Sequence, residues 1–199
     1  MANVDAPHGL TPHRYMNGAP YSGAATLYQI AAGYGTALFI GDPVDLVGTT
    51  DATGKYPTIS KPTLADGNYT IGPIVGFQET PAASLERIYS PASTLAYAWV
   101  ADDPQLIFSC QVDSAGTIGI ADFGLNGILI ETHSGDTSTG LSGLEFDEDS
   151  ATADASNMLM LLKLVDREDN ELALHADVEV LISMHRLGFS GSTDGRLGK

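Results

Sequence analysis

The chain has 199 residues, of which 43% are hydrophobic and only 17% are charged, and its formal net charge is −16. Nine basic residues without a basic run speak against nucleic-acid binding, because phosphate recognition needs clustered cations. The N-terminus lacks the basic start and apolar stretch of a signal peptide, and no segment approaches the roughly 20 apolar residues of a membrane span. We therefore expect neither a nucleic acid nor a membrane as partner.

Residues 1–23 are rich in Gly, Pro and Asn and show no helical or strand period. Such a segment is either a frayed terminus or an extended arm that becomes ordered against a neighbouring subunit. Its aromatic side chains favour the arm, since disordered tails are poor in aromatic residues. The residues expected to contact the partner are Arg14, Tyr15, Met16, Tyr21 and Tyr28.

Short apolar segments separated by Gly and Pro turns occupy residues 24–187. The alternation in residues 93–100 predicts a strand with Leu95, Tyr97 and Trp99 on one face, which we interpret as the core face. Asp102-Asp103-Pro104 follows and predicts a hairpin turn to a returning strand at residues 106–112. Further strands are expected at the segments 26–30, 36–40, 44–47, 71–77, 158–165 and 178–185, and two more within 116–130 on either side of a turn at 122–127.

This spacing predicts an all-β fold, namely an antiparallel β-barrel or sandwich with little helix. The organisation expected is an N-terminal arm at residues 1–23, a single β-rich domain at 24–187 and a flexible C-terminal tail at 188–199.

Motifs of catalysis and metal binding are missing from the sequence. There is no G-x-S-x-G, H-E-x-x-H or C-x-x-C pattern, and Cys110 lies in an apolar run that predicts a buried, inert thiol. The acidic stretches 147–149 and 166–169 are typical of solvated turns, although a structural cation between subunits stays open as an alternative. We expect no catalytic, cofactor-binding or metal-binding residues, and hence no enzyme.

Several stretches resemble a family of tailed-bacteriophage proteins that are encoded beside the major capsid protein and described as head-decoration or cement proteins. They include Gly41-Asp42-Pro43-Val44 and the Asp166-Arg167-Glu168-Asp169-Asn170 segment after a strand. The resembling segments are residues 2–10, 34–44, 74–77, 88–94, 101–104 and 164–172.

The resemblance implies a virion protein, made in the host cytoplasm, that stabilises the outer surface of the phage capsid without chemistry of its own. Its expected partners are the major capsid protein and copies of itself, with a homotrimer as the first expectation. Two alternatives remain, namely a head–tail connector or tail-tube subunit, and a carbohydrate- or receptor-binding virion module.

Overall fold

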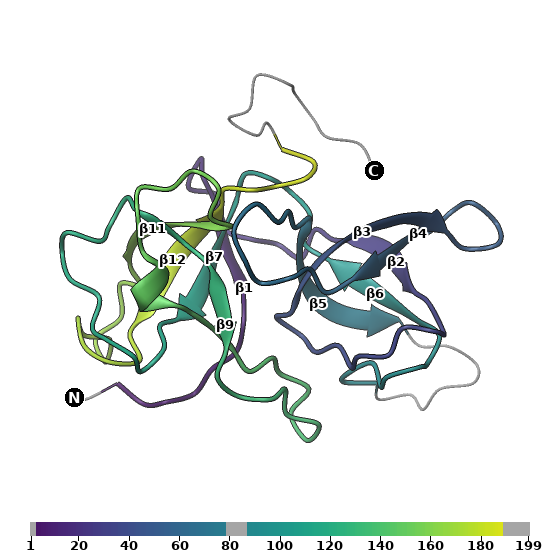
Figure 1. The fold of residues 1–199 in the computed structure, drawn as a ribbon, viewed down its shortest axis with the longest axis horizontal. Helices are drawn as coiled ribbons and strands as arrows, with labels where there is room; N and C mark the ends of the chain where they lie inside the picture. Colours follow the sequence, from purple (N-terminus) through teal and green to yellow (C-terminus); the bar gives the residue numbers. More distant parts are fainter. Residues whose placement is uncertain (1–2, 79–86, 189–199) are drawn as a thin grey trace.

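The computed structural model describes residues 3–78 and 87–188, which form two β lobes side by side (Figure 1). Nearly all regular structure is β, so the predicted all-β class is confirmed. Within these residues the helical structure is one 3-10 turn, η1 (Glu148–Ser150), and no helix is long and apolar enough to cross a membrane. Each lobe has its own cluster of buried apolar side chains.

The barrel lobe closes five strands in the order β2-β4-β3-β5-β6. Its neighbouring strands are antiparallel except for β2 and β4, which run parallel. The strands are β2 (Thr26–Ile30), β3 (Pro43–Thr50), β4 (Pro57–Ser60), β5 (Gly72–Gln78) and β6 (Ala96–Val100).

Strand β6 corrects one prediction about the core. Ala96 and Ala98 are fully buried, whereas Trp99 is 40% exposed. The alternation was identified correctly, but the expectation that the aromatic face points inward is wrong. Ala96 and Ala98 pack in one buried cluster with the bulky side chains of Tyr28, Ile59 and Ile74, so β6 turns its small side chains inward where these already fill the space.

The sheet lobe contains a five-stranded antiparallel sheet in the order β1-β7-β12-β11-β8, and a separate two-stranded ribbon of β9 and β10. Phe108 of the sheet and Phe146 of the ribbon belong to the same buried cluster, so the ribbon packs on the sheet. The strands are β1 (Thr11–Tyr15), β7 (Leu106–Gln111), β8 (Asn126–Gly127), β9 (Leu129–Glu131), β10 (Leu144–Phe146), β11 (Leu159–Leu164) and β12 (Asp177–Ile182).

The predicted hairpin between the strands around Asp102-Asp103-Pro104 is wrong, because β6 belongs to the barrel and β7 to the sheet. The three residues instead connect the lobes. Asp102 accepts hydrogen bonds from the hydroxyls of Thr26 and Tyr28, and Asp103 accepts one from the Gln105 N–H. The Asp102 bonds hold the connection against β2 of the barrel, and the Asp103 bond is a local one within the connection.

The segment expected to be an arm lies on the chain's own sheet. Strand β1 pairs with β7 at the sheet edge, and Leu10 is buried in the core of the sheet lobe. Without β1, strand β7 would form the edge of the sheet with unpaired backbone groups, and such an edge readily pairs with an extended segment. The structure therefore differs from the predicted organisation, in which residues 1–23 form an arm outside a single domain at 24–187. From residue 189 onward, the predicted C-terminal tail lies outside the described residues.

Buried contacts join the lobes, among them those of Gly41 and Arg186. Gly41 has a positive φ of 95°, and a Cβ there would lie 2.2 Å from the His8 carbonyl oxygen, so only glycine fits this crossing. Arg186, which follows β12, forms an ion pair with Asp45 of β3 and lies with its guanidinium carbon 5.0 Å from the centre of the Tyr69 ring.

Candidate functional site

The five residues expected to bind a partner occupy different environments. Tyr28 lies inside the barrel and donates a hydrogen bond of 2.7 Å to Asp102, and burial followed by this hydrogen bond raises its pKa. Arg14 donates hydrogen bonds to both carboxylate oxygens of Glu179. Both side chains are engaged within the chain, so neither serves as an exposed anchor.

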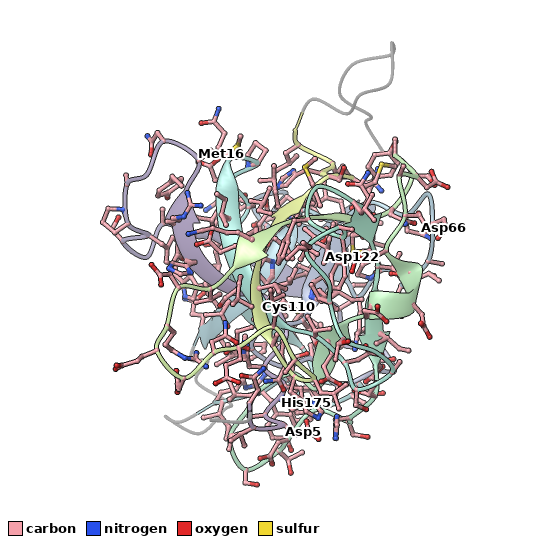
Figure 2. The ribbon with its side chains drawn as sticks, turned by 90° about the vertical axis from the view of Figure 1, so that its left-hand side faces the viewer. Asp5, Met16, Asp66, Cys110, Asp122 and His175 are labelled. Carbon is pink, nitrogen blue, oxygen red and sulfur yellow. The ribbon has the colours of Figure 1, made fainter. Side chains whose placement is uncertain are left out.

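Tyr15 and Tyr21 contact one another and are partly buried, whereas Met16 is exposed. Their ring centres are 6.5 Å apart, and both tyrosines pack against the core of the sheet lobe. Met16 follows β1 and is 56% exposed. It lies at the opposite end of the lobe from Asp5 and His175 (Figure 2).

A shallow apolar groove of about 430 Å³ contains one of the predicted residues. Tyr21 and Trp99 line it together with Val75 of β5. The glycines 23 and 76 also line the groove and give it room. An exposed tryptophan beside a tyrosine is typical of surfaces that bind a partner, because such side chains bury large areas at low entropic cost.

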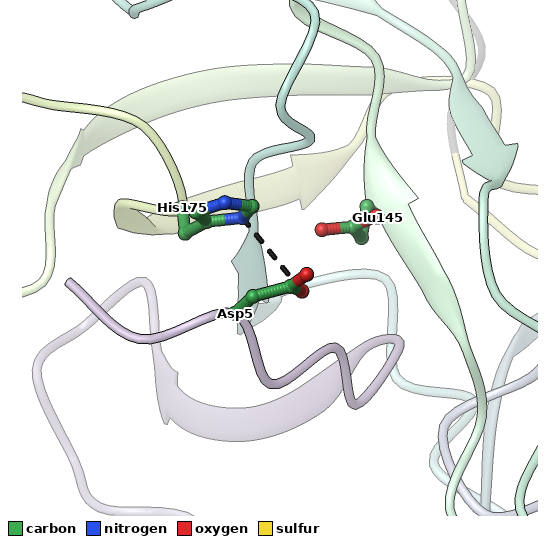
Figure 3. A group of neighbouring side chains, drawn as sticks. All are labelled: Asp5, Glu145 and His175. Atoms are coloured by element: carbon green, nitrogen blue, oxygen red, sulfur yellow. Dashed lines mark ion pairs between the residues drawn. The ribbon is translucent and has the colours of Figure 1, made fainter.

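A second cluster lies where the N-terminal segment, residues 3–8, meets the sheet lobe. It consists of Asp5, Glu145 and His175, each of which offers one ligand-type atom, and these atoms lie within 4.8 Å of one another (Figure 3). His175 Nδ1 lies 3.7 Å from Asp5 Oδ1. Glu145 belongs to β10, where Leu144 and Phe146 face the core and Glu145 faces the opposite side.

The side chain of Gln111 positions two members of this cluster. Its oxygen accepts the Ala6 N–H at 2.7 Å, and its amide nitrogen donates to the carbonyls of Val4 at 3.1 Å and His175 at 3.2 Å. The same buried amide therefore holds the residues on both sides of Asp5 and the backbone of His175.

Asn3 fastens the start of the N-terminal segment. Its amide group donates to the carbonyl oxygens of Glu171 and Leu174 and accepts the Glu171 N–H. His175 follows directly in the same β11–β12 loop and has a positive φ of 58°. These contacts bring the loop and the N-terminal segment to the buried carboxylate of Glu145.

Two side chains surround the cluster from the outside. Thr132 donates a hydrogen bond to Glu145 Oε2, and His133 lies between the carboxylates, with Nδ1 3.5 Å from Glu145 and Nε2 3.7 Å from Asp5. The remaining oxygen of Glu145, Oε1, is buried and has no hydrogen-bond partner among residues 3–78 and 87–188.

A cavity of about 380 Å³ adjoins the cluster along the N-terminal segment. His8, Arg167 and Asp177 line it, and Asp177 lies 3.5 Å from His8 Nε2 and 2.8 Å from the guanidinium of Arg167. Burial by itself raises the pKa of Asp177, but these two neighbours outweigh it and hold the pKa below its ordinary value. The cavity can accept a small polar molecule or ordered water.

Among the described residues, the other sequence candidates form no comparable site. Cys110 is buried as predicted, and burial raises the pKa of its thiol, so the thiolate needed for a nucleophile is suppressed. Asp147 and Glu148 lie at the 3-10 turn, where burial and neighbouring carboxylates, Asp113 among them, raise their pKa values.

Sequence reasoning predicted no metal-binding residues and missed the Asp5, Glu145 and His175 cluster. The three residues are separated by 140 and 30 positions and carry no local motif, so no spacing rule could have found them. Compared with known proteins, the chain matches no family model, no curated protein and no solved structure.

Proposed function

We propose that the chain is a structural protein of a tailed-phage virion, without catalytic activity, that decorates the capsid by binding the major capsid protein and its own copies. The observation that carries this proposal is the arrangement of the sequence segments that resemble head-decoration proteins. These segments are distant in sequence, and hydrogen bonds connect several of them to one another.

The hydrogen bonds connect the resembling segments in succession. The Asn3 side chain binds the backbone of Glu171, and the Leu10 N–H donates to the Gly41 carbonyl at 2.9 Å. The Gly41 N–H donates to the Ile74 carbonyl at 2.8 Å. Leu38 and Ser90 exchange two backbone hydrogen bonds, and Ala101 N–H donates to Pro73, the residue before Ile74.

This network supports a shared architecture more than a shared active site. Chance similarity would place the segments at unrelated points of the surface and interior. Here the segments 2–10 and 34–44 meet between the lobes, where Gly41 leaves room for the His8 carbonyl. A resemblance in residues that hold the backbone in place is a resemblance of the fold. Such a resemblance fits a structural protein.

The attachment surface in this proposal is the groove around Trp99 and Tyr21, with Met16 as a separate exposed anchor. Aromatic residues and Met are enriched at protein interfaces, where a few large side chains supply most of the binding energy. Multivalent binding on a symmetric capsid lets a weak contact of this size suffice.

The test uses purified protein and mature, undecorated capsids of its own phage. Saturable binding in a fixed ratio to the capsid subunits supports decoration, and light scattering of the free protein at the mass of three chains supports the homotrimer. A few copies per particle would instead assign the protein to the connector or tail. Lack of capsid binding, with signal on a glycan array, would favour the carbohydrate-binding alternative.

Substitutions locate the attachment surface in the same assay. Trp99→Ala and Met16→Ala are expected to lower capsid occupancy, since each removes a large exposed apolar side chain. Ile120→Ala is the matched control, because Ile120 is exposed on a loop away from the groove lining. Equal occupancy for all three variants would contradict the proposed surface.

A further inference from the structure

We infer that Asp5, Glu145 and His175 form a binding site for a divalent transition-metal ion of the zinc type. The site joins three parts of the sheet lobe, namely the N-terminal segment, strand β10 and the β11–β12 loop (Figure 3). This inference concerns the isolated chain and does not depend on the proposed virion role.

The buried carboxylate of Glu145 is the first argument. Its side chain is only 1% exposed, and within the described ranges 3–78 and 87–188 its Oε1 atom has no hydrogen-bond partner. The carboxylate points into the space between Asp5 and His175 (Figure 3). A buried charged oxygen without a donor is costly to fold, and a bound cation removes that cost.

The position of His175 is the second argument. Its Nδ1 atom is buried and likewise lacks a hydrogen-bond partner in the part of the chain that the structure describes. It faces Asp5 Oδ1 at 3.7 Å, which is too long for a hydrogen bond. Two atoms bound to one ion at roughly 2.0–2.2 Å each are separated by about 3–4 Å, so this spacing suits shared coordination.

The ligand chemistry selects the class of ion. One imidazole nitrogen and two carboxylate oxygens suit zinc and its first-row neighbours, whereas calcium and magnesium prefer sites made of oxygen alone. Three protein ligands leave a fourth position of a tetrahedral ion for water or another small ligand.

The groups around the three ligands fit the same interpretation. Thr132 binds Glu145 through Oε2 and so leaves Oε1 directed to the ion, while Gln111 holds the backbone of His175 and the neighbours of Asp5. Outer hydrogen bonds of this kind orient metal ligands and raise affinity. The ion would therefore fasten residues 3–8 to the body of the lobe.

The test is calorimetric titration of the untagged full chain with zinc chloride after dialysis against a chelator. We expect one ion per chain, and a tetrahedral Co²⁺ absorption spectrum when cobalt replaces zinc. Glu145→Gln replaces the anionic carboxylate with a neutral amide, His175→Asn removes the imidazole ligand, and Asn tolerates the positive φ of position 175. Each variant should weaken zinc binding at least tenfold.

The control is His13→Gln, which removes an exposed histidine on β1 that is not part of the cluster. It should leave zinc affinity unchanged. Absence of stoichiometric binding by the native chain, or an equal loss in the control, would overturn the inference.

A second measurement keeps the inference testable if the ligand variants fold poorly. Zinc should slow amide hydrogen exchange in residues 4–6 of the native chain, because the ion fixes Asp5 to the lobe. Thr132→Val, which leaves all three ligands in place, should lower zinc affinity by roughly 10- to 100-fold. Unchanged exchange in the presence of zinc, or unchanged affinity in this variant, would count against the site.

Discussion

The ion pair between Arg186 and Asp45 predicts that the two lobes unfold together. Both side chains are 8% exposed, and the guanidinium donates through two nitrogens to the two carboxylate oxygens. Arg186→Met keeps much of the apolar stem and removes the charge that pairs with the buried Asp45 carboxylate. Breaking one partner of a buried pair costs about 3–5 kcal/mol.

Urea unfolding tests this value with two signals, the fluorescence of Trp99 in the barrel lobe and circular dichroism of both lobes. Trp99 is the only tryptophan of the chain. For a chain of this size the cost corresponds to a melting temperature lower by roughly 6–20 °C. Lys55→Met, which removes the same charge from an exposed loop position, should change stability by less than about 0.5 kcal/mol.

Two results would refute the reasoning. If Arg186→Met destabilised the chain by less than about 1 kcal/mol, the pair would not be the buried contact described. If the two signals showed separate transitions in the native chain, the lobes would unfold independently, and the pair would not couple them. A double-mutant cycle with Asp45→Asn measures the coupling directly.

Three further predictions concern the same fold. Burial lowers the pKa of His185 to about 4, so between pH 6.5 and 4 the unfolded chain binds a proton that the folded chain does not bind. The free energy of unfolding should therefore fall by up to about 3 kcal/mol on acidification over this range. In the His185→Gln variant this fall should be smaller. Gly41→Ala should destabilise by about 3 kcal/mol in urea unfolding, because the new Cβ meets the His8 carbonyl at a positive φ; a loss under about 1 kcal/mol would contradict this. Ala98→Leu should lower the melting temperature through a loss of about 1–3 kcal/mol, because it overfills the barrel, and an unchanged melting temperature would argue against a closed interior at this strand.

Local features of the fold could be predicted from the sequence because they depend on near neighbours. The alternation along β6 and the burial of Cys110 are features of this kind. Which face of β6 points inward depends on the space that the side chains of the other strands leave inside the barrel. A prediction from hydrophobicity alone therefore assigned Trp99 to the core, whereas the structure buries Ala98 there.

The pairing of strands and the site depend on contacts between distant segments. Asp102-Asp103-Pro104 has the composition of a hairpin turn, but the strands on either side pair with other partners in different lobes. The candidate metal ligands come from the first residues, from β10 and from a loop near the end of the chain. A single sequence holds no signal that brings such residues together.

The position of the N-terminal segment determines how capsid attachment should be tested. Deleting residues 2–20 would be the natural test of an arm that reaches a neighbour. In this structure that deletion also removes β1 from the sheet edge, Leu10 from the core and Asp5 from the candidate metal site. Loss of capsid binding would then report a damaged lobe rather than a lost arm. Because Met16 is exposed at the end of β1 and Trp99 on the outside of the barrel, single substitutions at these two positions separate attachment from folding.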